Sequence, residues 1–129
     1  MKTEQSKLLF VYNANSTLFA QVTDFFHKAV SPSTYQCNLC RITYGNVGMK
    51  KQWQEFIQSL ALPVQFFHKD ELKQNQPELA SVELPAVFIV NEGKPRLLIN
   101  SFEIDGVHSI DSLIKLVETK LRQIKEMNL

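Results

Sequence analysis

The sequence predicts an α/β fold, with a central mixed sheet of about four strands flanked by helices. Unbroken apolar runs at Leu8–Tyr12 and Leu84–Val90 are typical of strands that are covered on both faces. Segments from Leu18 to Val30 and from Ile110 to Ile124 carry apolar side chains at helical spacing, and Ser109 is placed to cap the second. Strands thus alternate with helices, and a final strand–strand–helix unit adds an antiparallel edge to the sheet.

Turn and capping residues define the helices in the first half of the chain. Asn15 or Ser16 can cap the first helix, which ends at Ser31 because a proline follows. A turn at Gly45–Gly48 precedes a second helix that begins at Met49. The apolar face expected for that helix consists of Met49, Trp53, Phe56, Ile57 and Leu60.

The second half of the chain supplies the remaining strands. Pro63–Phe67 is expected to form a short strand, and the polar stretch from His68 to Glu83 a short helix or turns. Turn residues at Asn91–Pro95 then connect the strand Leu84–Val90 to a return strand at Arg96–Phe102.

Length and composition indicate one globular domain spanning residues 1–129. Of the 129 residues 44% are hydrophobic, which is enough for a core, and the net charge is +1. That charge gives no electrostatic argument for binding to nucleic acid or to an acidic membrane. The apolar run near the N-terminus is too brief for a signal peptide or a membrane-spanning helix. We therefore expect a cytoplasmic protein, whose two cysteines would be reduced at rest.

Both cysteines lie in the stretch Ser31–Gly45, as Cys37 and Cys40 with two residues between them. In a redox-active pair, one thiolate attacks a disulfide and the neighbouring thiol resolves the mixed intermediate. Helix N-terminal amides or a nearby cation lower the pKa of such a thiol from about 8.5. Arg41, which follows the second cysteine, could supply that cation.

A metal site is a second interpretation of the cysteine pair. A structural zinc ion takes four ligands, of which this motif supplies two. His27, in the first helix, and His68, after a strand, could complete a set with Cys37 and Cys40. The spacing fits no standard zinc motif, and zinc stays an alternative cofactor. A third interpretation makes both cysteines small buried side chains that hold a loop.

The order of elements resembles that of the thioredoxin-like fold superfamily, with CxxC early and "LPAVFIV–NEGKP–RLLIN–helix" late. In that family a proline begins the strand before the final hairpin, its preceding peptide bond is cis, and it lies against the CxxC motif. Pro85, preceded by Leu84, matches that position. The resemblance therefore implies a cis bond between these two residues.

The same resemblance implies a thiol–disulfide oxidoreductase that exchanges with a protein thiol or disulfide partner. Cys37 would be the attacking thiol, Cys40 the resolving thiol, and Pro85 would shape the substrate groove. Residues expected to line that groove are Leu84, Tyr35 and Tyr44. The alternative is a non-enzymatic binding module with the same fold, whose cysteine loop is structural or binds a metal.

One feature departs from the family, in which CxxC directly follows a core strand and opens the next helix. Here polar residues follow Leu8–Tyr12, and the cysteines come after the first long helix. Either a strand is hidden in Ser33–Gln36, or the cysteines lie in an insertion around residues 31–48. We favour the insertion, because the four residues between Pro32 and Cys37 leave little room for a strand.

The chain also resembles a set of small uncharacterised bacterial proteins that share VYNA and then SP-T-Y-C-LC--TYG. Some of them carry a GTPase label, which implies a phosphate-binding loop of the form G-x-x-x-x-G-K-[ST]. The nearest stretch here is GNVGMKK, residues Gly45–Lys51, in which the glycine spacing differs and neither Ser nor Thr follows the lysine. We therefore do not expect a GTPase.

Overall fold

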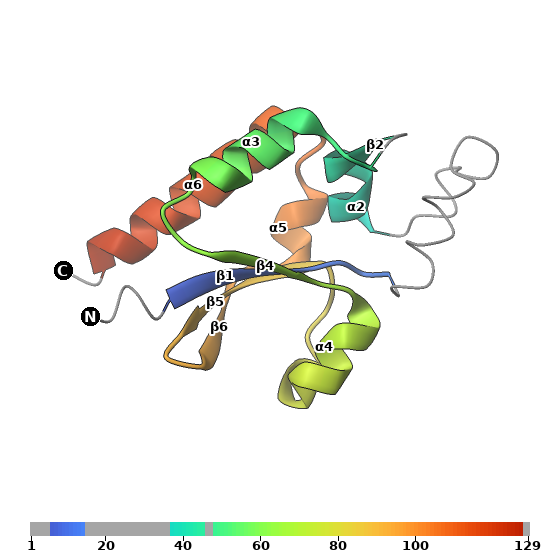
Figure 1. Ribbon diagram of the computed structural model, residues 1–129, viewed down its shortest axis with the longest axis vertical. Coiled ribbons are helices and arrows are strands. Elements are labelled where there is room, and N and C mark those ends of the chain that lie inside the picture. Colours follow the sequence, from blue (N-terminus) through green and yellow to red (C-terminus); the bar gives the residue numbers. More distant parts are fainter. Residues whose placement is uncertain (1–5, 15–36, 46–47, 128–129) are drawn as a thin grey trace.

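The computed structural model describes residues 6–14, 37–45 and 48–127, which form a mixed α/β structure (Figure 1). Its strands are β1 (Ser6–Val11), β2 (Tyr44–Gly45), β3 (Gly48–Met49), β4 (Val64–Phe67), β5 (Ala86–Asn91) and β6 (Lys94–Ile99). Its helices are α2 (Asn38–Thr43), α3 (Lys51–Ser59), α4 (Lys69–Asn75), α5 (Ser101–Asp105) and α6 (Ile110–Met127), with a 3-10 turn, η3 (Pro77–Leu79). The helix expected at Leu18–Val30 lies outside the described residues.

Four strands form one sheet in the order β4-β1-β5-β6 (Figure 1). Strand β1 pairs in parallel with β4 and antiparallel with β5, and β6 pairs antiparallel with β5. The carboxyl ends of β1 and β4 therefore lie at the same end of the sheet. A mixed sheet of four strands flanked by helices was predicted from the sequence and is confirmed.

Both faces of this sheet are covered. Helices α2, α3, α5 and α6 lie on one face, and α4 lies on the other (Figure 1). Alternate residues of β1 belong to two separate cores: Leu8 and Phe10 pack on the first face, Leu9 and Val11 on the second. A strand that is buried on both faces has apolar side chains at every position, which explains the unbroken run in the sequence.

Trp53 of α3 is fully buried in the first of these cores, as the helical pattern predicted. Its ring meets Phe10 edge-on, with centroids 5.6 Å apart and an interplanar angle of 88°. Leu113 and Val117 of α6 are also fully buried in this core. The two longest described helices are thus held to the sheet through their apolar stripes.

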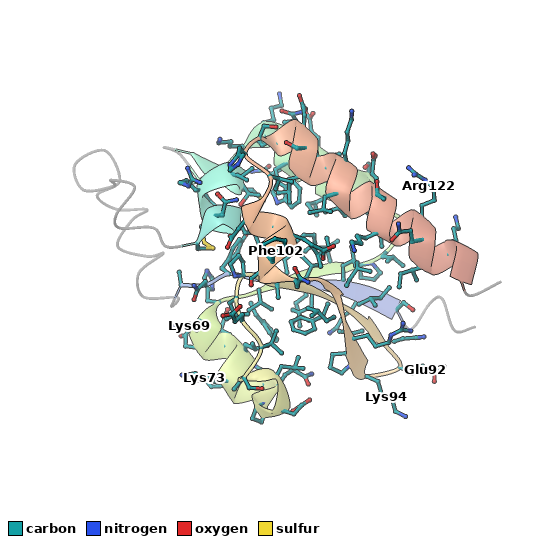
Figure 2. All side chains as sticks on the ribbon, turned by 180° about the vertical axis from the view of Figure 1, so that it is seen from behind. Lys69, Lys73, Glu92, Lys94, Phe102 and Arg122 are labelled. Atoms are coloured by element: carbon teal, nitrogen blue, oxygen red, sulfur yellow. A yellow bond between two sulfur atoms is a disulfide. The ribbon has the colours of Figure 1, made fainter. Side chains whose placement is uncertain are left out.

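Several predicted boundaries are wrong. Strand β5 begins at Ala86 rather than Leu84, and β6 begins at Lys94 rather than Arg96. Helix α3 begins at Lys51 rather than Met49, which lies in β3 and pairs with Tyr44 of β2. The return strand β6 ends at Ile99, so the segment up to Phe102 is not all strand. Phe102 lies instead on the short helix α5, where its side chain is 84% exposed (Figure 2).

A capping box explains why a helix replaces the end of the predicted strand. The Asn100 side chain accepts a hydrogen bond of 2.8 Å from the Glu103 N–H. In return, the Glu103 carboxylate accepts one of 3.1 Å from the Asn100 N–H. These reciprocal bonds satisfy amides that the first helical turn leaves unpaired.

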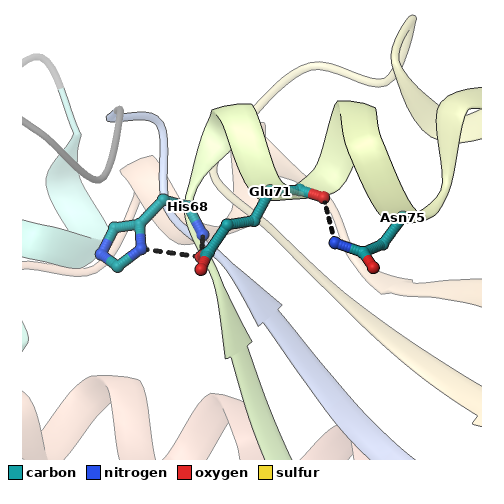
Figure 3. A network of polar contacts seen from close by, with 3 residues as sticks. All are labelled: His68, Glu71 and Asn75. Carbon is teal, nitrogen blue, oxygen red and sulfur yellow. Dashed lines mark hydrogen bonds and ion pairs between the residues drawn. The ribbon is translucent and has the colours of Figure 1, made fainter.

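Helix α4 begins with a second capping arrangement, shown in Figure 3. Oε1 of Glu71 accepts a bond of 2.7 Å from the His68 N–H and lies 2.8 Å from His68 Nδ1. Nδ2 of Asn75 donates to the backbone oxygen of Glu71 at 2.8 Å. A short helix was among the structures expected here.

Within residues 6–14, 37–45 and 48–127, no helix is both long and apolar enough to cross a membrane.

Candidate functional site

The two cysteines form a disulfide bond at the beginning of α2. Their Cα atoms are 5.2 Å apart, within the range that a disulfide spans. They thus stand in the first turn of a helix, whereas the sequence led us to expect a loop. The part of the expected insertion before Cys37 lies outside the described residues.

Local geometry makes Cys37 the N-cap of this helix. Its backbone is extended, with φ −114° and ψ 107°, and its Sγ accepts a hydrogen bond of 3.1 Å from the Cys40 N–H. The sulfur thereby takes the place that a Ser or Asp oxygen often occupies at a helix start. At the other end of α2, the Thr43 hydroxyl donates to the Leu39 carbonyl at 2.7 Å.

A second backbone amide reaches the same sulfur from the sheet. The Asn13 N–H, just beyond β1, donates to Cys37 Sγ at 3.3 Å. The segment from Tyr12 to Ala14 is itself held beside β4, because Tyr12 N–H donates to Phe67 O and Ala14 O accepts from Lys69 N–H, both at 2.9 Å. The disulfide therefore lies at the carboxyl end of β1.

Pro85 lies at this same end of the sheet. Strands β1 and β5 run antiparallel, and Val11, the last residue of β1, pairs with Ala86, the first residue of β5. Pro85 directly precedes that pair and is buried, and its peptide bond with Leu84 is cis, as the resemblance implies. The register thus brings the proline and the amide donor of Asn13 to neighbouring positions.

Asn38, the first residue between the cysteines, ties α2 to α5. Its Nδ2 donates to the backbone oxygens of Ile104, at 2.9 Å, and of Val107, at 2.8 Å. Its Oδ1 accepts a hydrogen bond from the Arg41 guanidinium. The Asn38 side chain is buried, while Arg41 is exposed. The arginine next to the motif therefore contacts the asparagine amide.

Both cysteines are buried: Cys37 is 1% exposed and Cys40 is 0% exposed. They pack with Leu39 and Ile42 in the core on the helix-rich face of the sheet. Exchange with a partner requires access to one of the two sulfurs. This burial bears directly on the choice between a redox pair and a structural pair.

A group of aromatic side chains lies beside the site. The Tyr12 ring, adjacent in the chain to Asn13, is 5.7 Å from the ring of Tyr44 and 5.7 Å from that of His68. It also stacks on Phe66 at 5.8 Å. Burial raises the pKa of Tyr12 well above 10.0 and also raises the pKa of Tyr44. Both tyrosines therefore keep their protons at neutral pH.

Of the three residues predicted to line a groove, the structure describes Tyr44 and Leu84, and these two pack in different cores. Tyr44 packs in the core on the α3–α6 side of the sheet, while Leu84 packs in the core beside α4. Tyr35 lies outside the described residues. The sheet thus separates the two groove residues that the structure describes.

The predicted metal ligands are only partly described. His27 lies outside the described residues, and His68 contacts Glu71 (Figure 3). In the described part of the chain, no group of three or more His, Cys, Asp or Glu side chains is arranged to hold a metal ion. The third histidine of the chain, His108, is exposed.

Neither Asn13 nor Asn38 was among the residues predicted to form the site. Asn13 acts through its backbone amide, which no side-chain pattern reveals. Asn38 offered one signal, a polar side chain between two cysteines, but its partners in and just after α5 are 66 and 69 positions away in the chain. Comparisons of the chain with protein-family models, with curated proteins and with solved structures gave no significant match.

Proposed function

We propose that this protein is a small thioredoxin-like thiol–disulfide oxidoreductase that uses Cys37 and Cys40. The observation that carries the proposal is the position of Cys37, which caps α2 while its sulfur accepts hydrogen bonds from Cys40 and Asn13. In the thioredoxin-like pattern, CxxC follows a core strand and opens a helix. The contact with Asn13 brings the start of α2 to the carboxyl end of β1, which supports this pattern, although 23 residues (14–36) lie between Asn13 and Cys37 in the chain.

The element order supports the same proposal. A parallel β1–β4 pair is followed by the antiparallel hairpin β5–β6 and then by the long helix α6. This is the order that the resemblance implies, with the proline at the start of β5. Sites in open α/β sheets commonly form at the carboxyl ends of the strands, where the disulfide lies.

The proposed exchange has two steps. In the reduced protein, the Cys37 thiolate attacks a partner disulfide, forming a mixed disulfide and releasing one partner thiolate. Cys40 then gives up its proton and attacks the Cys37 sulfur, which forms the Cys37–Cys40 bond and releases the second partner thiolate. The released thiolates take up the two protons that the cysteines lost. Two electrons pass to the partner, and a separate dithiol reductant, itself oxidised to a disulfide, supplies two electrons that regenerate the reduced protein.

The two amides at Cys37 suit this chemistry. Hydrogen bonds to a sulfur favour its anionic form over its protonated form, and the thiolate is the attacking species. Cys40 has no comparable donor among the hydrogen bonds of the described residues, and its N–H is directed at its partner sulfur. The asymmetry supports Cys37 as the attacking residue and Cys40 as the resolving one.

A second candidate function is favoured by the burial of both cysteines. In this alternative the chain is a thioredoxin-like binding module, whose disulfide fixes α2 against the sheet and takes no part in exchange. Residues that are 1% and 0% exposed offer little surface to an incoming disulfide. The two functions differ in whether the pair exchanges while the protein stays folded.

Equilibration of the native full-length chain with reduced and oxidised glutathione tests the proposal. We expect a reversible Cys37–Cys40 disulfide, seen as a mass change after the free thiols are alkylated. A chelator should leave the result unchanged. Thiols that react only after denaturant is added, with no metal released, would establish the structural alternative.

Single-cysteine variants separate the two roles. Cys40→Ser should trap a mixed disulfide between Cys37 and glutathione, because the resolving thiol is missing. Cys37→Ser is the matched control and should trap less, because the two amide donors that favour a thiolate are at the Cys37 sulfur and not at that of Cys40. Equal trapping in both variants would contradict the assigned roles.

A further inference from the structure

Asn38 connects the cysteine pair to an element that carries neither cysteine. Its amide donates to Ile104 O of α5 and to Val107 O just beyond it, at 2.9 and 2.8 Å. The Ile104 carbonyl also accepts the Val107 N–H at 3.2 Å, so the Asn38 amide adds a side-chain donor from α2 to the turn that ends α5. The bond to Ile104 is buried and the bond to Val107 is partly buried, which limits the competition from water.

The location of Asn38 within CxxC gives this contact a consequence for the dithiol. In the oxidised protein, the disulfide itself holds Cys37 and Cys40 in one helical turn. In the reduced protein that covalent link is gone, and the bonds from Asn38 would then be what keeps the same turn against the core. Held in this way, the two thiols have a high effective concentration for each other, which favours formation of the disulfide.

We propose that Asn38 is a positioning residue that shifts the Cys37–Cys40 equilibrium toward the disulfide by anchoring α2 to α5. The inference rests on the proposed function, since it concerns the equilibrium of the same pair. Asn38 does not contact the protein whose thiol or disulfide is exchanged. It acts by limiting the freedom of the reduced turn.

The test measures the equilibrium constant between dithiol and disulfide in a glutathione buffer, with the folded full-length chain. Losing two hydrogen bonds of ordinary net strength should change that constant by about tenfold. We therefore expect Asn38→Ala to shift the equilibrium about tenfold toward the dithiol, or about 30 mV for a two-electron couple. Asn38→Ser keeps one donor and is a milder change, for which we expect about threefold.

Matched controls separate anchoring from general loss of stability. Asn75→Ala removes an asparagine that also donates to a backbone carbonyl, but on α4 across the sheet. Val117→Ala opens a cavity at a fully buried position of α6. Both should stay within about twofold of the unmodified protein, because neither change removes a contact of Asn38.

A variant on α5 tests the same coupling from the other element. It should change the dithiol–disulfide equilibrium only if Asn38 acts through its anchor on α5. Asn100→Ala removes the cap of α5, so it weakens the surface to which Asn38 is anchored. Because coupling between two sites is reciprocal, this change should also shift the equilibrium toward the dithiol. A merely local effect of Asn38 on the two sulfurs predicts no shift here.

The outcomes are distinguishable. If the unmodified protein forms no reversible disulfide in native buffer, the proposed function fails, and the role of Asn38 fails with it. If the unmodified protein cycles while the Ala and Ser variants at position 38, both folded by circular dichroism, stay within twofold of it, the positioning role alone is wrong. Shifts in the variants of Asn38 and Asn100, with none in the controls, support it.

Discussion

The backbone N–H of Asn13 donates a hydrogen bond to Sγ of Cys37 across 3.3 Å, although 24 positions separate the two residues in the chain. Through this bond the carboxyl end of β1 meets the first turn of α2. Cys40 contributes a second amide to the same sulfur. A change in the oxidation state of that sulfur should therefore change the chemical environment of two amides, one just beyond β1 and one in α2.

Reduction of the disulfide should change the amide ¹H shifts of Asn13 and Cys40 more than those of distant strand residues. The reason is that the charge and the geometry of the acceptor sulfur change on reduction. Two-dimensional ¹H–¹⁵N spectra of the oxidised and reduced protein measure this. Val90, which pairs with Lys7 toward the opposite end of β1, is the control. An unmoved Asn13 amide would show that the contact is absent in solution.

Trp53→Ala should reduce the free energy of unfolding by about 3–5 kcal/mol, because a fully buried indole leaves a cavity. Urea unfolding followed by circular dichroism measures the loss, since Trp53 is the chain's single tryptophan and its fluorescence disappears with it. Phe102→Ala is the control. That ring is 84% exposed, so its removal should change stability by no more than about 0.5 kcal/mol. Similar losses in both variants would contradict the described core.

Tyr12 should make stability decrease in alkaline solution. Burial raises its pKa well above 10.0 in the folded protein, so the unfolded chain ionises first. The stabilising contribution is complete below pH 10.0 and is lost as the pH rises through the folded value. Tyr12→Phe should therefore flatten the decline in unfolding free energy above that pH. Tyr44→Phe, where the pKa is raised less strongly, should flatten it less.

Glu103 links α5 to α6 through a contact of 2.6 Å with Lys120. Partial burial acts to raise the pKa of Glu103, but hydrogen bonds from Lys120 and Asn100, with the lysine charge, outweigh it and lower the pKa below 4.5. The resulting stabilisation is present above pH 4.5 and is lost as the pH falls through the lowered folded value.

Glu103→Gln keeps an oxygen for the Asn100 cap and removes the charge. It should cost about 0.2–1 kcal/mol at pH 7, as for a partly exposed ion pair, and almost nothing at strongly acidic pH. Urea unfolding at a series of pH values measures the difference. Glu118→Gln, at an exposed position of α6, is the control. A cost that persists unchanged in acid would assign the effect to capping instead of charge.

Much of the fold could be predicted because burial leaves a periodic pattern in the sequence. The unbroken run at Leu8–Tyr12 predicted a strand covered on both faces, and helical spacing from Ile110 onward predicted α6. The predicted end of β6 was wrong because the apolar residue Phe102 extends the strand pattern. The capping box at Asn100, which starts a helix there, competes locally with that pattern.

The candidate site divides in the same way. The sequence by itself determined the two cysteines, their spacing and the proline before β5. Tertiary structure decided that Cys37 begins a helix, that Asn13 donates to its sulfur, and that Asn38 anchors the motif to α5. The spacing of apolar residues predicts which side chains are buried, because each helix or strand turns its apolar face toward the core. Contacts between elements depend on the register of the sheet and the packing of helices on it, and these are set by the whole chain at once.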